Sequence, residues 1–534
     1  MVKLGDRTRG RGVAFSISAI ALAVGLAACG SGSSTSVSKS STVQSGTKAS
    51  VPAVGGTLTY ANTAGPISMN PAIMGNGRLG IFGEPAYDSL ITIQPDGKLT
   101  PDLATSWGFV AGSNNTVFDI TLRNGVKFSN GTTMTAQDVV NTIQYYQKTA
   151  RFSIVMGKIA SVTATGPNAV KITLAQPNPD LAYAFDQVLQ MGDIIAPAGL
   201  ANPQGMSNAT FGTGPYVLDS SQTIPGTTYT YLPNKYYWNP SAIHWKKIVI
   251  KVFTDSNSAL QALESGQVQV MLGDPTLATT AISAGGVNVL ASPVQWSGMI
   301  IADHGGQVVP ALANPKVRQA LNYAVNRAAI TKALYGSYGS PTDQLQGIGL
   351  SGYSQSFQNY YSYNPTKAKA LLSQAGYPHG FSMTLVEQGT SQTNLMAEAF
   401  AGQMAQIGVN VTIKNDASFG QYVTDFTSKK FPILAQELNY GSPFFISLEL
   451  FSPMLWNPFN VVSARDNALL QQALLASPSQ ASSRWKALFT GVMKNGYWIP
   501  ISNSDVVYFT SKSVTAVAPG ETLNINPVTV TPAQ

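Results

Sequence analysis

The chain has 534 residues, of which 44% are hydrophobic and only 11% are charged. This composition is that of a globular protein, and the length is sufficient for two or three domains with sizeable cores. The formal net charge is +7, of which residues 1–28 contribute +3 through four basic residues and one acid. The charge that remains is too small and too scattered to favour nucleic acid or an anionic membrane surface as the partner.

Residues 1–28 have the three parts of a signal peptide: a basic head, an apolar core over residues 13–26 and small residues before Cys29. The core is shorter than the run of about 20 apolar residues that a membrane-spanning helix needs. Cys29 is the only cysteine, and the sequence Leu-Ala-Ala-Cys that ends there resembles the lipobox of bacterial lipoproteins, whose cysteine thiol is lipidated. We therefore expect a lipid anchor on Cys29, with an ordinary secretory peptide as the alternative.

Residues 29–54 are rich in Ser, Gly and Thr, so they cannot bury apolar surface and are predicted to be a flexible tether. No run of about 18 or more apolar residues follows, so we expect no second membrane anchor. A single cysteine also excludes a disulfide within the chain, and the fold must be held by its cores.

The first predicted elements beyond the tether are a strand at residues 56–60, where apolar and polar side chains alternate, and a helix at about 79–90. Residues 116–122 and 126–128 read as the two strands of a hairpin, because a turn dipeptide, Asn124-Gly125, separates them. This part of the chain is therefore predicted to mix strands with a helix.

Thr135 and Asp138 are spaced as the two members of a helix capping box, and an apolar stretch with helical periodicity follows them. We therefore expect a helix with Thr135 as its N-cap. The next predicted elements are a pair of strands at residues 159–164 and 169–174.

Two helices of the second half have clear boundary signals. Asn314 reads as an N-cap followed by proline, and the apolar residues beyond it recur at helical spacing. Arg318 on this helix, like Arg327, could pair with an acid at a domain contact or lie on a solvated face. A second helix at residues 366–375 ends at Gly376, which suits a helix C-terminus.

The reactive side chains limit the enzymatic options. The three histidines, His244, His304 and His379, are isolated in sequence, so each is expected to be an ordinary hydrogen-bonding residue rather than a metal ligand. The chain also lacks a Gly-x-Ser-x-Gly elbow, a P-loop and a His-Glu-x-x-His helix. We expect no enzymatic activity, cofactor or metal. An exported hydrolase built on carboxylates distant in sequence stays open as an alternative.

Several short motifs between about residues 55 and 510, taken in order, resemble the family 5 solute-binding proteins of ABC importers, which include oligopeptide, dipeptide, nickel and some sugar receptors. Each motif is weak by itself, and their glycines, prolines and apolar spacing fit structural roles. The motifs are residues 87–90 (YDSL), 101–107 (PDLATSW), 118–128 (FDITLRNGVKF), 135–139 (TAQDV), 212–216 (GTGPY), 234–238 (NKYYW) and 314–327 (NPKVRQALNYAVNR).

The resemblance implies an α/β fold of the type II periplasmic-binding-protein-like class, with two lobes joined by hinge strands and an inserted α+β domain. Each lobe is expected to have a mostly parallel sheet. Lobe I is expected at residues 55–98, 206–292 and 500–534, the inserted domain at 99–205 and lobe II at 293–499. Such a fold closes around its ligand by a hinge motion.

The resemblance also implies that the solute lies between the lobes. Aromatic side chains suit a solute pocket because they offer a large apolar face, to which Tyr and Trp add a polar group. Packing in a core is the alternative for each aromatic residue, and for one of the two adjacent phenylalanines it is the expectation. The expected ligand-binding residues are Asn62, Thr63, Trp296, Asn439, Tyr440, Phe444 and Phe445.

Residues 436–445 (QELNYGSPFF) depart from the peptide-binding members of the family, which place an aspartate there to pair with the ammonium group of the peptide. This segment has no aspartate, and Glu437 is its only acid. A buried cation needs a counter-charge. The departure therefore weakens a zwitterionic peptide as the ligand, without removing it.

The resemblance further implies a monomeric receptor outside the cytoplasm, held at the cell surface or in the periplasm by its N-terminal lipid. It would capture a peptide-like or other small solute and deliver it to an ABC permease with ATPase subunits for transport across the membrane. A sensor on the same fold that takes no part in transport stays open as an alternative.

Overall fold

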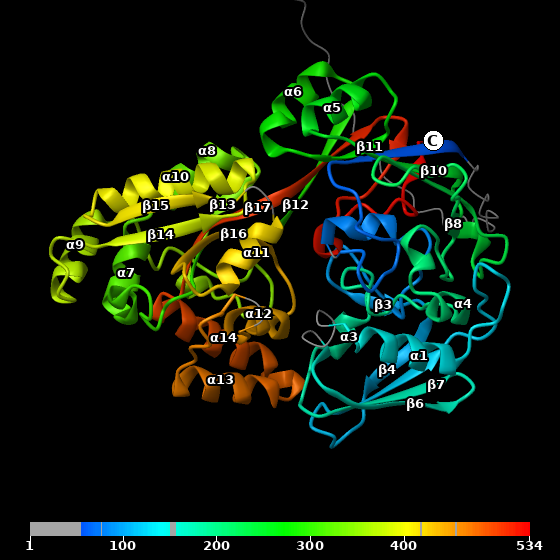
Figure 1. Ribbon diagram of the computed structural model, residues 1–534, viewed down its shortest axis with the longest axis horizontal. Coiled ribbons are helices and arrows are strands. Elements are labelled where there is room, and N and C mark those ends of the chain that lie inside the picture. The colour runs from blue at the N-terminus through cyan, green and yellow to red at the C-terminus, as the bar shows by residue number, and fades with distance from the viewer. Residues whose placement is uncertain (1–54, 76, 150–155, 417–418, 454–455, 534) are drawn as a thin grey trace, which may run out of the picture. The chain divides into compact units, whose positions relative to one another are not determined.

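The computed structural model describes residues 55–75, 77–149, 156–416, 419–453 and 456–533 (Figure 1). The expected signal peptide, Cys29 and the whole tether lie outside the described residues, so the interpretations of them stay predictions. Within the described ranges, no helix is both long and apolar enough to cross a membrane.

Lobe I is the group of strands around β1 (Gly55–Asn62), which pairs in parallel with β10 (Trp245–Val252) on one side and with β11 (Val270–Gly273) on the other. Beyond β10, the strands β9 (Thr228–Pro233) and β8 (Tyr216–Leu218) pair antiparallel. The strand predicted at the start of the folded chain is confirmed as part of β1.

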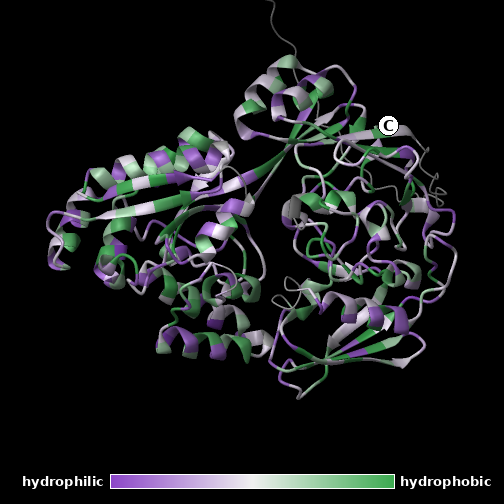
Figure 2. Cartoon of the chain, viewed as in Figure 1, coloured by the Kyte–Doolittle hydropathy of each residue, from purple (hydrophilic) through white to green (hydrophobic). Residues whose placement is uncertain are grey.

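Lobe II is the group around β14 (Ser382–Glu387), which pairs in parallel with β15 (Asn410–Asn415) and β16 (Ile433–Asn439). Figure 2 shows β14 mostly in the hydrophobic colour, because it is the middle strand of the three. The central pairs of both lobes are parallel, but antiparallel pairs outnumber parallel ones in lobe I, so the mostly parallel sheet expected there is wrong.

Two long antiparallel strands, β12 (Val287–Ile301) and β17 (Trp498–Ser511), are shared by the lobes (Figure 1). β17 pairs with β11 in lobe I, and β12 pairs with β16 in lobe II. The sheet therefore runs through both lobes in the order β15-β14-β16-β12-β17-β11-β1-β10-β9-β8, with β13 (Gly339–Pro341) paired to β17 off this path. These are the two hinge strands that the resemblance implies.

The inserted domain contains a separate antiparallel sheet in the order β4-β5-β7-β6. Its strands are β4 (Ala104–Phe109), β5 (Val117–Leu122), β6 (Ile159–Gly166) and β7 (Ala169–Leu174). The pair predicted at residues 159–164 and 169–174 is therefore confirmed as β6 and β7.

The hairpin predicted between residues 116–122 and 126–128 is wrong. β5 pairs with β4 and β7 instead. Residues 126–128 turn back on the segment that follows, since Phe128 N donates to Thr132 O at 2.9 Å and Met134 N donates to Val126 O at 2.9 Å. The turn that closes this contact contains Gly131, whose φ of +90° suits glycine.

Helix α1 (Ala136–Tyr146) begins as predicted. Thr135 is its N-cap, and both the amide and the hydroxyl of Thr135 donate to Asp138 Oδ2 at 2.8 Å. The helix predicted at 79–90 is only a short 3₁₀ helix, η1 (Gly77–Phe82). The helix cannot continue through Pro85, because proline lacks an amide hydrogen and clashes with the preceding turn.

The remaining helices connect the strands and cover the sheets. They are α3 (Leu181–Ala184), α4 (Pro197–Ala201), α5 (Ser256–Glu264), α6 (Ala278–Ala284), α7 (Pro315–Tyr323), α8 (Arg327–Tyr335), α9 (Pro365–Gln374), α10 (Ser391–Ala405), α11 (Phe419–Thr427), α12 (Pro443–Phe451), α13 (Ala464–Leu474) and α14 (Pro478–Asn495). Short strands and 3₁₀ helices complete the fold, namely β2 (Ile91–Ile93), β3 (Leu99–Pro101), β18 (Val514–Thr515), β19 (Thr531–Pro532), η2 (Gly205–Ser207), η3 (Pro240–Ala242), η4 (Pro275–Leu277), η5 (Pro310–Ala313), η6 (Gln355–Phe357) and η7 (Gly520–Thr522). α7 and α9 match the two helices predicted from boundary signals, and Gly376 beyond α9 has a φ of +90°.

Arg318 and Arg327 take neither of the two roles considered for them. Only 3% of Arg318 is exposed, and its guanidinium donates to carbonyl oxygens instead of pairing with an acid. Arg327 is also buried and donates to the carbonyl oxygens of Thr342 at 3.1 Å and Pro500 at 2.7 Å. Both arginines therefore join separate loops and strands inside lobe II.

Several of the motifs that carry the resemblance meet where lobe I joins the inserted domain. Asp88 accepts a hydrogen bond from Trp238 Nε1 at 2.9 Å, and the Arg123 guanidinium lies 4.0 Å from the centroid of that indole ring. A Cβ atom on Gly212 would lie 2.3 Å from the carbonyl oxygen of Ala86, so only glycine fits. These motifs hold two parts of the chain together, which agrees with the structural role predicted for them.

Candidate functional site

The segment from the end of β16 to the first turn of α12 carries four of the predicted site residues. Asn439 ends β16, and Phe444 and Phe445 lie in the first turn of α12. Ser442 is the N-cap of α12, and its hydroxyl accepts a hydrogen bond from the Phe445 amide at 3.2 Å. Pro443 occupies the first helical position, where an amide hydrogen would have no partner within the helix. The local sequence thus defines where the loop ends and the helix begins.

Trp296 and Tyr440 lie on one face of the sheet in lobe II. Trp296, opposite Leu438 of β16 and Asn503 of β17, is 2% exposed and shares a buried apolar cluster with Tyr440 and Phe444. The Tyr440 hydroxyl donates to Asn503 Oδ1, and burial raises the pKa of Tyr440, so the phenol keeps its proton. The Nε1–H group of Trp296 has no hydrogen-bond partner among the described residues. The structure therefore brings these three predicted residues together.

Asn439 lies on the opposite face of the sheet. Its Oδ1 accepts a hydrogen bond from Gln295 Nε2 at 3.2 Å. Two residues earlier on the same strand, Glu437 accepts a hydrogen bond from the Tyr335 hydroxyl at 2.8 Å. Strand alternation places residues 437 and 439 on this face and away from Trp296. Glu437 is therefore engaged by α8 of its own lobe.

Asn62 and Thr63 lie at the end of β1 in lobe I. Asn62 is 3% exposed, its Nδ2 donates to Ala64 O at 3.0 Å, and its carbonyl oxygen accepts from Phe253 N at 2.8 Å. Thr63 is exposed. Asn62 thus stabilises the turn after β1, and a ligand contact by either residue stays a prediction.

The loop after β16 also contacts the inserted domain directly. The Phe444 amide donates a hydrogen bond at 3.1 Å to Oδ2 of Asp180, a residue 264 positions away that precedes α3. Burial raises the pKa of Asp180, and hydrogen bonds from the Ser442 side chain and the Phe444 amide offset part of this effect. The carboxylate lies at the N-terminus of α12, where free amides and the helix dipole favour negative charge. Asp180 therefore connects the inserted domain to lobe II.

A second acid reaches the same region from the C-terminal segment. Glu521 lies in η7, where its amide donates to Pro95 O at 3.1 Å, and burial raises the pKa of its carboxyl group. Its charge adds to burial in raising the pKa of Tyr440 in lobe II and of Tyr183 in α3. The charge of Asp180 likewise raises the pKa of Tyr183. Glu521 therefore acts on a phenol of lobe II and on one of the inserted domain, whereas Asp180 acts only on the latter.

A further contact links the lobes near the hinge strands. Gln392 Nε2, at the start of α10 in lobe II, donates to Asp274 Oδ2 of lobe I at 3.2 Å. Sequence reasoning missed this pair, and it missed Asp180 and Glu521. Each of these residues meets its partner only through the fold, so no local motif could have found it.

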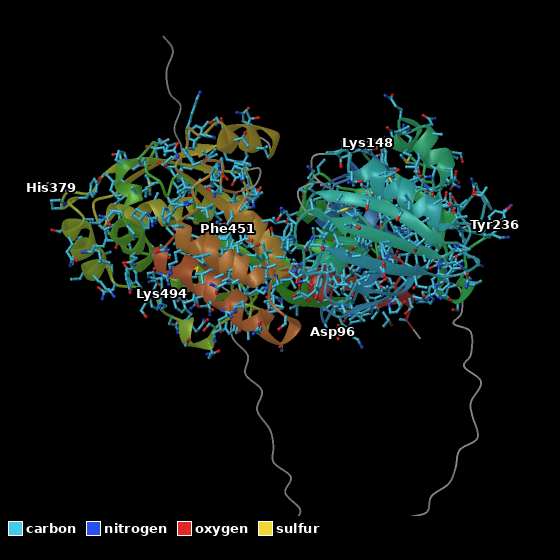
Figure 3. The ribbon with its side chains drawn as sticks, turned by 90° about the horizontal axis from the view of Figure 1, so that it is seen from below. Asp96, Lys148, Tyr236, His379, Phe451 and Lys494 are labelled. Atoms are coloured by element: carbon cyan, nitrogen blue, oxygen red, sulfur yellow. The ribbon has the colours of Figure 1, made fainter. Side chains whose placement is uncertain are left out.

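His304 and His379 are placed as ordinary residues, whereas Nδ1 of His244 is buried and has no hydrogen-bond partner among the described residues. The ring nitrogens of His304 lie 3.2 and 2.9 Å from the carbonyl oxygens of Ile301 and Val461. His379 is exposed and lies at the outer margin of its lobe, away from Phe451 at the end of α12 (Figure 3). Among the residues that the structure describes, no group of three His, Cys, Asp or Glu side chains could hold a metal ion.

The sequence profile of the bacterial extracellular solute-binding proteins, family 5 (middle region), matches residues 98–447. The chain belongs to this family. It is a solute-binding receptor, and its family 5 relatives act outside the cytoplasm as binding proteins.

One such relative is the glutathione-binding protein GsiB of Escherichia coli K12, which is 27% identical over 452 residues that cover 80% of this chain and 85% of GsiB. The fold is also that of two solved family 5 structures. DppA of Helicobacter pylori, in complex with the peptide STSA, is 20% identical with a TM-score of 0.76 over 90% of this chain and 99% of DppA. AgaA of A. tumefaciens R10, in complex with agropinic acid, is 22% identical with a TM-score of 0.76 over 90% of this chain and 99% of AgaA.

Proposed function

We propose that this chain is the lipid-anchored receptor of an ABC importer, which captures a small, peptide-like solute between its lobes and delivers it to a membrane permease. It acts as a monomer outside the cytoplasm, held to the membrane by a lipid on Cys29, and it catalyses no reaction. The observation that carries the proposal is the interlobe arrangement, in which the Phe444 amide at the start of α12 in lobe II donates a hydrogen bond to Asp180 of the inserted domain.

The domain boundaries given above, with lobe I in three pieces, belong to this proposal. The shared strands β12 and β17 support it, because a chain that crosses twice between lobes can open and close by bending at the crossings. The aromatic residues Trp296, Tyr440 and Phe444 would then form the lobe II side of the solute site, with Phe445 at its margin. The solute would stabilise the closed arrangement of the lobes, because it would bind that arrangement with higher affinity than the open one.

A peptide-like solute is favoured by the relatives. GsiB is named for glutathione, itself a small peptide, and DppA was solved with a peptide. AgaA was solved with agropinic acid, so the fold also serves for other solutes.

The proposal is tested by native mass spectrometry of the full-length chain, purified from its own host in mild detergent. A small molecule that is retained under native conditions and lost on denaturation, and that identifies as a peptide or related amide, is the expected result. A retained sugar or metal complex would contradict the peptide-like assignment. Turnover of the released molecule by fresh protein would contradict the assignment as a receptor and favour a hydrolase.

A further inference from the structure

The exposed charges of lobe II are almost all positive. Among the described residues between 293 and 499, the only exposed acid is Glu398 of α10, while Asp425 and Glu437 are half-buried. The exposed basic residues there are Lys316, Lys332, Lys367, Lys369, Lys429, Lys430, Arg465, Arg484, Lys486 and Lys494. In lobe I and the inserted domain, by contrast, exposed acids accompany the exposed lysines, namely Asp96, Asp119, Asp255 and Glu264.

This asymmetry arises because the other acids of lobe II are used inside it. Asp303 accepts hydrogen bonds from the amides of residues 307–309 at 2.6 to 2.8 Å, and Asp466 accepts one from the Tyr497 hydroxyl at 2.9 Å. Also buried are Asp343, Glu387, Asp416 and Glu449. The net charge of the chain therefore conceals the surface charge of this lobe. The expectation from the sequence that no anionic surface is favoured counted buried and exposed charges alike.

The positive charge is concentrated on four helices that pack one after another, beginning with α9 and α7. Lys316 Nζ, at the start of α7, donates to Gln374 Oε1, at the end of α9, at 3.2 Å. Lys367 Nζ, in the first turn of α9, lies 3.7 Å from the centroid of the Tyr323 ring at the end of α7. The two helices therefore run antiparallel, and each brings a lysine to the opposite end of the other.

Helices α14 and α13 continue this surface. Gln319 Nε2 of α7 donates to the carbonyl oxygen of Lys494, near the end of α14, at 2.8 Å, and Arg484 of α14 donates to Gln472 Oε1 of α13 at 3.0 Å. Figure 1 shows the four helices from α9 at the edge of lobe II, through α7 and α14, to α13. Their only acid, Asp466, is buried. We call the exposed basic residues of these helices the basic face: Lys316, Lys367, Lys369, Arg465, Arg484, Lys486 and Lys494.

The composition of the basic face indicates the kind of partner. Most of its members are lysines, whose ammonium groups are point charges on flexible stems, whereas arginine suits a single carboxylate or phosphate held in fixed geometry. Charge that is spread over four helices suits an extended anionic surface better than one small ligand. A bilayer with anionic phospholipids is such a surface, and it attracts each nearby Lys or Arg separately. The lipid proposed on Cys29 would keep the folded chain beside a bilayer.

We propose, as an inference that rests on the membrane anchoring in the proposed function, that the basic face binds the anionic headgroups of the membrane that holds the chain. The lipid then limits how far the receptor can move from the bilayer, and the basic face sets its orientation. Lobe II lies with α7, α9, α13 and α14 toward the headgroups.

The experiment uses the full-length lipidated chain in three preparations: vesicles of phosphatidylcholine, vesicles that also contain about 30% phosphatidylglycerol, and membranes of the host. A membrane-impermeant reagent acetylates accessible lysines, and mass spectrometry of peptides gives the labelling rate of each lysine. Lys148 and Lys158 serve as the internal reference, since both are exposed in the inserted domain. Relative to this reference, we expect the lysines of the basic face to be labelled about fivefold more slowly in anionic than in neutral vesicles. The difference should disappear in about 0.5 M salt, which screens exposed charges.

Neutralising part of the basic face tests the same point by a second route. In a chain that carries Lys316→Gln, Lys367→Gln and Lys494→Gln, the remaining lysines Lys369 and Lys486 should lose most of their protection in anionic vesicles. All three substituted side chains are exposed, so this variant should unfold at the Tm of the unmodified chain.

The matched control replaces three exposed lysines outside lobe II, namely Lys127, Lys235 and Lys246, by glutamine. It removes the same charge from the chain and should leave the protection of the basic face unchanged. Equal loss of protection in this control would show that only the net charge matters, and would overturn the assignment to the basic face.

The remaining outcomes separate this inference from the function on which it rests. Equal relative labelling in neutral and anionic vesicles, or protection that persists in high salt, would overturn the inference and leave the anchored receptor standing. Protection in host membranes alone would assign the face to an acidic protein and would also overturn it. A chain that binds anionic but not neutral vesicles would support the basic face and contradict the lipid anchor, while binding to neither would contradict both.

Discussion

Replacing Arg318 by methionine should destabilise lobe II more than any surface change. The guanidinium donates to the carbonyl oxygens of Asn495, His304, Leu312 and Ala313 at distances of 2.6 to 3.2 Å. It also lies 5.1 Å from the centroid of the Tyr497 ring. Methionine keeps much of the aliphatic stem but none of the donors, so buried carbonyl oxygens lose their partners.

The magnitude follows from these contacts. Each hydrogen bond from a charged group contributes about 1.5–3 kcal/mol, but losses at one residue do not add fully, so we expect about 3–5 kcal/mol for Arg318→Met. For a lobe of about 200 residues this corresponds to a fall in Tm of about 6–20 °C. Arg318→Lys should lose about half as much, because one ammonium group keeps the charge but cannot reach all four oxygens.

Differential scanning calorimetry of the full-length chain measures this effect as a shift in the transition that contains lobe II. Arg484→Met is the control, since Arg484 is exposed and donates to Gln472 Oε1 at 3.0 Å on the surface. It should change stability by no more than about 0.5 kcal/mol. If R318M unfolded within that margin of R484M, the assignment of Arg318 as the group that joins these loops would be refuted.

The other predictions concern a buried acid, a helix cap and the anchor. Burial raises the pKa of Glu84 from its ordinary value of 4.5 to about 8, so the folded state holds a proton that the unfolded state releases, and stability falls as pH rises between these values. Glu84→Gln should therefore gain stability relative to the unmodified chain by up to about 1.4 kcal/mol per pH unit over this window in urea titrations, and a constant difference from pH 5 to 8 would contradict it. Asp138→Ala should cost about 1 kcal/mol through loss of the α1 capping box, which chemical denaturation measures; no loss would show that the cap contributes nothing. Cys29→Ala should move the chain from the membrane fraction to the soluble fraction and remove the lipid mass from its N-terminus, and retention in the membrane would disprove lipid anchoring at Cys29.

Much of the fold could be predicted from the sequence because local signals dominate there. The Thr135 and Asp138 cap, the Asn314 cap and the glycine after α9 each act within a few residues, so their chemistry is visible in the chain. The failed hairpin at residues 126–128 shows the limit of this reasoning. The turn dipeptides Asn124-Gly125 and Asn130-Gly131 are only six residues apart there in the sequence, and only the sheet shows that β5 pairs with β4 and β7.

The candidate site was only partly predictable for a similar reason. Trp296, Tyr440 and Phe444 could be expected together, since the resemblance marks their segments and the structure buries them in one cluster. Asn439 lies on the face of the sheet opposite Trp296, because side chains alternate along β16 and the register pairs Asn439 with Gln295. No local motif marks Asp180 or Glu521, because the residues on which they act come from distant parts of the chain.

The sharing of β17 between the lobes also bears on when the protein can fold. The sheet that runs through both lobes cannot be completed before residues 498–511 have been synthesised, because β17 lies between β12 and β11. Pairings over such long sequence separations form slowly. A newly made chain therefore cannot complete the pairing that joins its two lobes until residues 498–511 are available.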